Sequence, residues 1–145
     1  HAMLSAAIRA TFDRGVAQWR AAPPLKPLVN DTADAATLAP RPFLAEVSAA
    51  DFIASHVLHE EVFGSAALVV RVASVNEAIA VLESVDGSLT VTLWGAESES
   101  DDTRRLVRVA TQTAGRVLFS GVPTGVAVAA AQAASMANRL RRPRP

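Results

Sequence analysis

The residue types best suited to chemistry are gathered in one short segment, His59-Glu60-Glu61-Val62-Phe63-Gly64, with His56 just before it. Two imidazoles and two carboxylates so close together raise the question of a metal site. The spacing differs, however, from the His-Glu-x-x-His pattern that presents two imidazoles on one helix face. The chain holds three histidines in all, so we predict no metal site. From the residue types alone, a polar loop leading into a strand explains the segment best.

The composition of the 145-residue chain excludes several classes of protein. It contains no cysteine, which rules out disulfides, thiolate metal sites and a cysteine nucleophile on this chain. The 14 basic and 14 acidic side chains balance, so no general attraction to nucleic acid is expected. With 50% hydrophobic and 19% charged residues, a folded core is expected without covalent staples.

The elements that must position this segment alternate in type. From residue 43 onward, short apolar runs alternate with amphipathic stretches, which favours an α/β fold with an open, mainly parallel sheet. We expect three layers, with helices on both faces of the sheet. Ala66–Ala73 is a nearly continuous apolar run, as expected of a buried central strand. Strands are predicted at 43–47, 66–73, 89–94 and 116–120, and helices at 48–56, 74–85, 100–115 and, as a helix or tail, 126–140.

Serines mark the predicted starts of three helices. Ser48 and Ser74 are each followed three residues later by an acidic residue, as in a capping box, and Ser100 precedes two aspartates. Gly115 stands where a helix is expected to end, in the position that glycine favours. Residues 121–125 are predicted to form a turn.

The amino-terminal region divides into a helix and a long connection. Residues 4–20 are predicted to form an amphipathic helix because five large apolar side chains recur at steps of three and four. Residues 23–42 are rich in proline, as is typical of a connection that wraps a surface. The apolar stripe of the helix consists of Leu4, Ile8, Phe12, Val16 and Trp19.

The two ends are interpreted separately from the fold. Residues 1–3 resemble a cloning remnant, and residues 129–145 read as an alanine-rich helix or tail with a basic end. The uncharged stretch from residue 117 to 138 contains Gly121 and Pro123 and much alanine, so we predict no membrane span. No secretory signal is recognisable near the start. A cytoplasmic location is therefore expected.

The segment His59–Gly64 resembles the Glu-Glu-Ile/Val-Phe-Gly-Pro motif of the aldehyde dehydrogenase superfamily. The strand beginning Pro42-Phe43-Leu44, the helix start Asn76-Glu77-Ala78 and the pair Leu89-Thr90 follow the family's spacing. Residues 114–126 are similar to bacterial 2,5-dioxovalerate (α-ketoglutarate semialdehyde) dehydrogenases. The resemblance covers residues 4–128 and implies a partial catalytic domain of that fold. The chain departs from the family at two serines, Ser65 in place of proline and Ser120 in place of asparagine, and after Val128.

The resemblance implies a cofactor, NAD or NADP, and two residues that contact it. Carried over residue by residue, Glu61 would hold the hydroxyl groups of the nicotinamide ribose and Phe63 would pack beside that ribose. A carboxylate can accept two hydrogen bonds from a diol, and an aromatic face can orient a neighbouring ring. Ordinary core packing is the alternative for Phe63, and a solvated surface position is preferred for Glu60. No catalytic residue is assigned, since the family's cysteine and general-base glutamate precede the matched region.

Two functions from different classes follow. The first is a fragment of an NAD(P)-dependent aldehyde dehydrogenase, which oxidises a small-molecule aldehyde, for example a semialdehyde, to a carboxylate. That fragment is expected to be inactive alone. The second is a non-catalytic binding or oligomerisation module with a degenerate fold of this family. In either case we expect self-association through apolar faces: the stripe of helix 4–20, residues 126–137, or strand 89–94 at a sheet edge.

Overall fold

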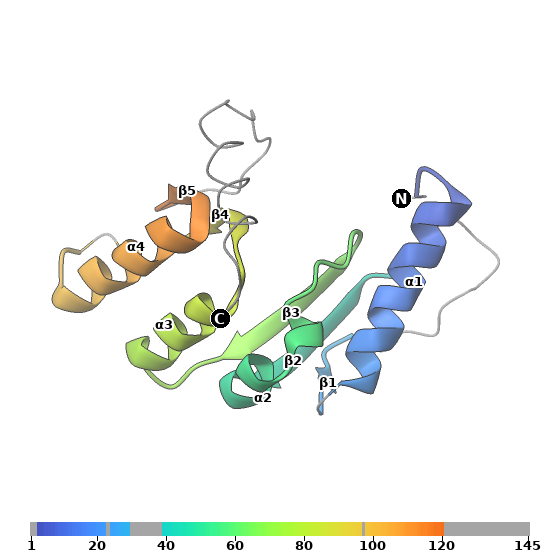
Figure 1. Cartoon of the computed structure of the whole chain (residues 1–145), viewed down its shortest axis with the longest axis horizontal. Helices are drawn as coiled ribbons and strands as arrows, with labels where there is room; N and C mark the ends of the chain where they lie inside the picture. Colours follow the sequence, from blue (N-terminus) through green and yellow to red (C-terminus); the bar gives the residue numbers. More distant parts are fainter. Residues whose placement is uncertain (1–2, 23, 30–38, 97, 121–145) are drawn as a thin grey trace, which may run out of the picture. The chain divides into compact units, whose positions relative to one another are not determined.

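A computed structural model describes residues 3–22, 24–29, 39–96 and 98–120 (Figure 1). The predicted turn at 121–125 and the predicted helix or tail at 126–140 lie outside these residues. The chain divides into two compact units, His1–Ser84 and Val85–Pro145, and each is described by itself. Both units combine helices with parallel strand pairs, which confirms the α/β class.

The first unit contains a three-stranded sheet in the order β1-β2-β3. Strand β2 (Phe43–Ser48) pairs in parallel with β3 (Ala66–Arg71), and Phe43 lies opposite Ala66. The two strands and their parallel pairing are as predicted. The very short β1 (Lys26–Pro27), which pairs with β2 in the antiparallel sense, was not predicted.

Helix α1 (Ala6–Ala21) supplies the largest buried side chains of the first unit. Phe12, Val16 and Trp19 are all buried. The Trp19 ring lies 6.1 Å from that of Phe43, centroid to centroid, and its indole Nε1 donates a hydrogen bond of 3.1 Å to the Val57 carbonyl. The amphipathic helix is confirmed. For Phe12, Val16 and Trp19 the expectation of a stripe left exposed for a partner is wrong, because these side chains are covered by the helix's own unit. Of the other two stripe residues, Ile8 is half-buried, and Leu4, which precedes the helix, is 92% exposed.

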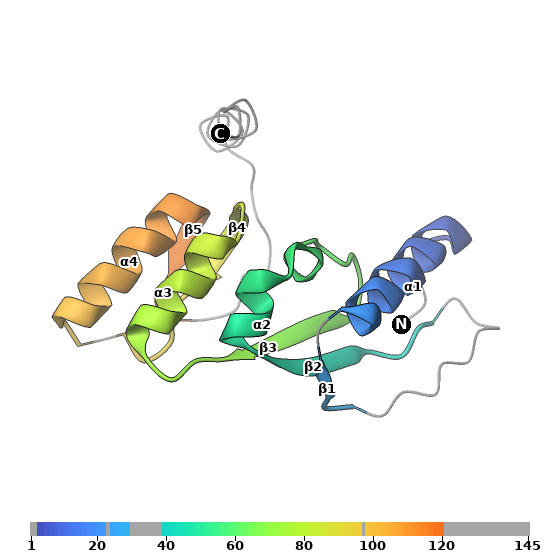
Figure 2. The same cartoon turned by 60° about the horizontal axis from the view of Figure 1, so that its bottom comes forward.

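The sheet of the first unit is covered on one face by the described helices. Figure 2 shows α1 and α2 (Ala49–Ala54) on the same side of β2 and β3. On that side of β2 every residue is buried: Phe43, Ala45 and Val47. On the opposite side Ala67 and Val69 of β3 are exposed, and an ion pair of 2.7 Å joins Arg71 to Glu46.

The prediction of a buried central strand at Ala66–Ala73 is therefore wrong within the described residues. Strand β3 ends the described sheet, and exposed and half-buried residues alternate along it. A continuous apolar run is typical of strands covered on both faces. Here only the face shared with Phe43 and Val47 receives helices.

The predicted capping serines are confirmed at all three helices. Ser48 accepts a hydrogen bond of 3.1 Å from the Asp51 amide at the start of α2. At the start of α3 (Val75–Ser84), Ser74 accepts one of 3.2 Å from the Glu77 amide, while the Glu77 carboxylate accepts one of 2.6 Å from the Ala73 amide. These contacts satisfy amides that have no partner within the helix itself.

The second unit pairs β4 (Ser88–Thr92) in parallel with β5 (Ala114–Leu118), with α4 (Asp101–Thr113) between them in the chain. Ser100 caps α4 by accepting from the Thr103 amide at 3.1 Å. The three arginines on the outer face of α4 are exposed, as predicted. Arg104 binds Asp101 and Glu99, and these hydrogen bonds raise the pKa of its guanidinium.

Gly115 does not end α4, which corrects the prediction. The helix ends at Thr113, Ala114 already has an extended backbone, and Gly115 is the second residue of β5. A methyl group on Gly115 would lie 3.4 Å from the Leu89 carbonyl oxygen of the neighbouring strand. This is an ordinary contact distance, and Gly115 is a residue of the strand rather than the end of the helix.

None of the described helices has both the length and the apolar character that a membrane crossing requires.

Candidate functional site

The segment His59–Gly64 forms the connection between the 3-10 turn His56–Leu58 and β3. His59 begins this connection and is anchored: its Nε2 donates a hydrogen bond of 2.8 Å to the Phe52 carbonyl, and the two rings lie 4.7 Å apart. The His56 ring is 5.5 Å from that of His59. In the part of the chain that the structure describes, no group of three or more His, Asp or Glu side chains is arranged to hold a metal ion.

Two glycines bring the segment into close contact with α1. A methyl group on Gly15 would lie 2.8 Å from Cγ2 of Val62. A methyl group on Gly64 would lie 2.5 Å from Cδ2 of Phe12, and the φ of Gly64 is +147°. Real side-chain carbons do not approach this closely, so only glycine fits at either position. Helix α1 thereby packs against the loop at two places: Gly15 contacts Val62, and Phe12 contacts Gly64.

Glu61 and Phe63 occupy the solvent side of the same loop. Glu61 is exposed, Val62 is half-buried against α1, and 65% of Phe63 is exposed. Core packing, the alternative for Phe63, is therefore not what the structure shows. Glu60 is exposed, as expected of a solvated surface position.

The contact of α1 with this loop was not predicted from the sequence. A signal was present: Gly15 lies in the middle of the helix, where glycine costs about 1 kcal/mol relative to alanine. A glycine in that position indicates close packing by another segment. Its partner, Val62, lies 47 residues further on, and spacing along the sequence gives no means of pairing the two.

Two curated proteins are similar to part of this chain, whereas no family model matches it. α-Ketoglutaric semialdehyde dehydrogenase 2 of Azospirillum brasilense is 44% identical over 85 residues, which is 59% of this chain and 16% of that protein. α-Ketoglutaric semialdehyde dehydrogenase of Acinetobacter baylyi is 41% identical over 71 residues, 49% of this chain and 14% of that protein. The chain carries a segment related to aldehyde dehydrogenases. The resemblance seen in the sequence is thus confirmed.

The matched segment covers only 16% and 14% of the lengths of these two relatives. On the loop His59–Gly64, the Glu61 carboxylate and the Phe63 ring are both exposed, and Val62 between them packs against α1. The carboxylate offers hydrogen-bond acceptors, and the ring offers an apolar face. A carboxylate and an aromatic ring are side chains that suit a ligand with neighbouring hydroxyl groups beside a planar ring.

Proposed function

We propose that this chain is part of an NAD(P)-dependent aldehyde dehydrogenase that oxidises an aldehyde, and specifically a semialdehyde, to a carboxylate. In this proposal Glu61 accepts hydrogen bonds from the nicotinamide ribose and Phe63 packs beside it. The observation that supports the proposal is that Glu61 and Phe63 are both exposed on a loop that packs against α1 at Gly15 and Gly64. The similarity to two α-ketoglutaric semialdehyde dehydrogenases supports the choice of reaction.

The residues present fit that role chemically. The ribose of a nicotinamide cofactor has two adjacent hydroxyl groups, and one ionised carboxylate can accept a hydrogen bond from each. A loop fixed before the ligand arrives loses less conformational entropy on binding. When bound, the nicotinamide ring supplies the hydride acceptor of the reaction. The task of Glu61 and Phe63 is then to orient that ring toward the substrate.

The chain's own residues do not supply the covalent step. Aldehyde oxidation through a thioester needs a cysteine thiolate as nucleophile, and the chain has no cysteine. In the proposed enzyme the nucleophile and the rest of the cofactor site come from other residues than these 145. We therefore expect no aldehyde-dependent reduction of NAD or NADP by the chain alone.

The proposal includes a three-layer sheet and self-association. The bare face of β2 and β3, with exposed Val69, favours cover by a further layer in the complete protein. In the second unit Leu89 and Trp94 are more than half exposed. Contiguous apolar surface tends to be covered by association, and in this proposal Leu89 of β4 and the nearby Trp94 contribute to such an interface. Residues 126–137, the other expected interface, lie outside the described residues.

A segment exchange tests the cofactor role. The matched segment of the Azospirillum brasilense enzyme is replaced by this chain's, and reduction of NAD is followed with α-ketoglutaric semialdehyde. Glu61→Gln is expected to lower kcat/KM for NAD about tenfold, because a charge-assisted hydrogen bond is weakened. Phe63→Ala is expected to raise KM for NAD, and Glu60→Gln is the matched control with no effect. An active exchange enzyme whose kinetics ignore Glu61→Gln and Phe63→Ala would refute the proposal.

A non-catalytic module is the second candidate, favoured by one observation. Trp19 is buried inside its own unit, so the first unit has a core that needs no other chain. If the chain is such a module, the exchange enzyme should fold and assemble but should not reduce NAD. An active exchange enzyme excludes it.

A further inference from the structure

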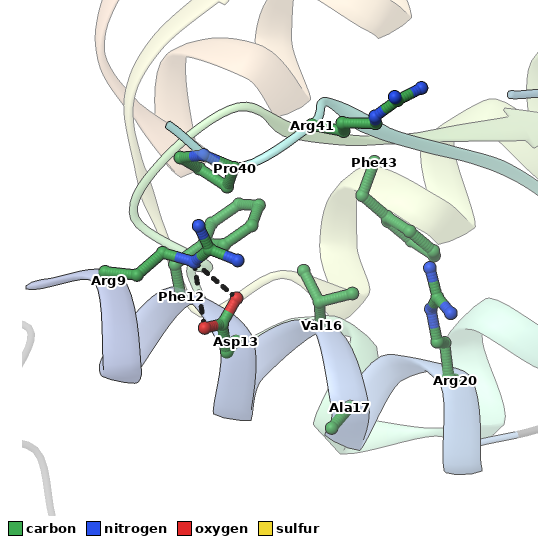
Figure 3. A pocket seen from close by; sticks show the side chains of 9 residues that line it. All are labelled: Arg9, Phe12, Asp13, Val16, Ala17, Arg20, Pro40, Arg41 and Phe43. Atoms are coloured by element: carbon green, nitrogen blue, oxygen red, sulfur yellow. Dashed lines mark hydrogen bonds and ion pairs between the residues drawn. The ribbon is translucent and has the colours of Figure 1, made fainter. Parts of the chain in front are cut away.

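A pocket of about 180 Å³ lies within the first unit, between α1 and the segment that leads into β2 (Figure 3). It is separate from the loop that carries Glu61 and Phe63. The α1 residues that line it are spaced three and four apart along the chain (9, 12/13, 16/17 and 20), and residues with this spacing share one side of a helix. The lining residues are Arg9, Phe12, Asp13, Val16, Ala17, Arg20, Pro40, Arg41 and Phe43.

Charged groups stand at both ends of this pocket. At one end Arg9 is only 7% exposed, and its Nε lies 2.9 Å from the Asp13 carboxylate. At the other end the Arg20 guanidinium lies over the Phe43 ring, 5.2 Å from its centroid. Figure 3 shows Arg41 extending away from the Arg9–Asp13 pair. Among the lining residues Arg9, Arg20 and Arg41 are basic and Asp13 is acidic.

Between the charged ends the pocket wall is apolar. Phe12, Val16 and Phe43 are all buried side chains. Pockets for drug-sized ligands measure about 300–1,000 Å³, so this one suits a smaller molecule. A matching ligand has a short apolar body and an anionic end.

We propose that this pocket binds a short-chain organic carboxylate. The hydrocarbon part lies over Phe12 and Val16, and the carboxylate faces the guanidinium group of Arg20, at the end of the pocket opposite the Arg9–Asp13 pair. Arginine matches a carboxylate because its planar fork offers two parallel N–H donors. The proposal does not depend on the proposed function, since none of the lining residues belongs to the cofactor-contacting loop.

An NMR titration of the 145-residue chain with sodium pentanoate, at low ionic strength, tests the inference. Saturable shifts are expected at the backbone amides of Phe12, Val16 and Phe43. Pentanamide, the neutral analogue, tests the need for charge. Inorganic phosphate tests the need for an apolar body. Raised salt should weaken the binding of pentanoate, because screening acts on the exposed Arg20.

Two variants and two matched controls make the test specific to the pocket. Ala17→Phe fills the pocket from an exposed helix position and is expected to weaken pentanoate binding at least about tenfold. Arg20→Gln removes a charge-assisted contact and is expected to weaken it by about the same factor. The controls Ala10→Phe and Arg14→Gln alter exposed positions of α1 outside the pocket. Both controls should leave binding unchanged.

Several outcomes would overturn the proposal. They are the absence of saturable shifts, equal binding of pentanamide, equal binding of phosphate, and equal weakening by Arg14→Gln and Arg20→Gln. Amide spectra of each variant show whether the fold is kept. If Ala17→Phe disturbs the fold, Arg20→Gln against Arg14→Gln decides the question by itself.

Discussion

The chain's two tryptophans report how differently its two units are built. Trp19 in the first unit is 7% exposed, packs near Phe43 and donates to a backbone carbonyl. Trp94 in the second unit is 67% exposed. An indole side chain contributes large apolar area only where several elements converge on it. The difference therefore reflects how many elements meet in each unit.

In the first unit, elements distant in sequence share one core. Helix α1, the 3-10 turn and β2 all contribute buried residues, among them Phe12, Phe43 and Leu58. In the described part of the second unit only Ala110 and Ala114 are buried, and Leu89, Trp94 and Phe119 are largely exposed. Two strands and one helix cover little apolar area. We therefore expect the first unit to contribute most of the free energy of unfolding of the described residues.

The largest effect is expected from truncating the buried tryptophan. Trp19→Ala removes a packed ring and its hydrogen bond, and should lower the free energy of unfolding by about 3–5 kcal/mol. Trp94→Ala should change it by no more than about 0.5 kcal/mol, because the ring is mostly solvated. Urea unfolding followed by circular dichroism measures both. Equal losses for the two variants would contradict the comparison.

The next effect separates steric contact from backbone strain at two glycines. Gly64 and Gly87 have nearly the same φ, +147° and +151°. A methyl group at Gly64 would meet Phe12 at 2.5 Å, whereas at Gly87 its nearest neighbour is the Thr113 oxygen at 3.7 Å. Both alanine variants pay about 1–3 kcal/mol for the backbone. Gly64→Ala should lose about 1–3 kcal/mol more, from overpacking.

Thermal unfolding of the two glycine variants gives that difference. An equal loss of stability at both positions would mean that the loop can move away from α1. It would contradict the interpretation that close packing against α1 fixes the loop. In that case Gly15→Ala, which would place a methyl group 2.8 Å from Val62, should also be tolerated.

A smaller and more even effect is expected at the helix caps. Ser48→Ala in the first unit and Ser100→Ala in the second each remove one hydrogen bond to a backbone amide. Each should cost about 1 kcal/mol. Amide hydrogen exchange should show the loss throughout the first unit for Ser48→Ala, and only in α4 for Ser100→Ala. Loss of protection throughout the chain for both would show that the units unfold together.

The smallest effect is expected at the exposed ion pairs of α4. Arg104 binds Asp101 at 2.6 Å and Glu99 at 2.9 Å, with all three side chains largely solvated. Its pKa is raised by these contacts, so it stays cationic throughout the neutral range. Exposed pairs add little stability. Arg104→Ala should leave the urea midpoint unchanged at both low and high salt, and a clear salt-dependent loss would contradict this.

The local elements could be predicted because their causes lie within a few residues. Ser48, Ser74 and Ser100 cap the helices that their spacing indicates, since a capping contact joins residues three apart. Parallel pairing of β2 with β3 and of β4 with β5 follows from the alternation of strands and helices. Gly115 was wrongly predicted to end α4, because a glycine just after a helix and a glycine inside the strand that follows look alike in a sequence.

The candidate site also has a part that could be predicted from the sequence and a part that could not. The motif Glu61-Val62-Phe63-Gly64, with its resemblance to aldehyde dehydrogenases, was evident from the sequence, and the similarity to two such enzymes confirms the relationship. The residues that hold the motif, Gly15 and Phe12, were not evident. Both residues lie about 50 positions before the motif in the chain. Their packing against the loop depends on how closely α1 approaches it in the fold, and residue spacing along the sequence does not give that distance.

By itself, the sequence determined the α/β class, the helix starts and the related family, since these rest on periodicity, neighbouring side chains and a short motif. Only the tertiary structure decided which apolar surfaces are buried. It covered Trp19 within its own unit and left Val69 and Trp94 exposed, although all three are apolar residues in predicted helices or strands. Burial depends on which distant elements arrive at a face, and apolar character states only that a side chain can be covered.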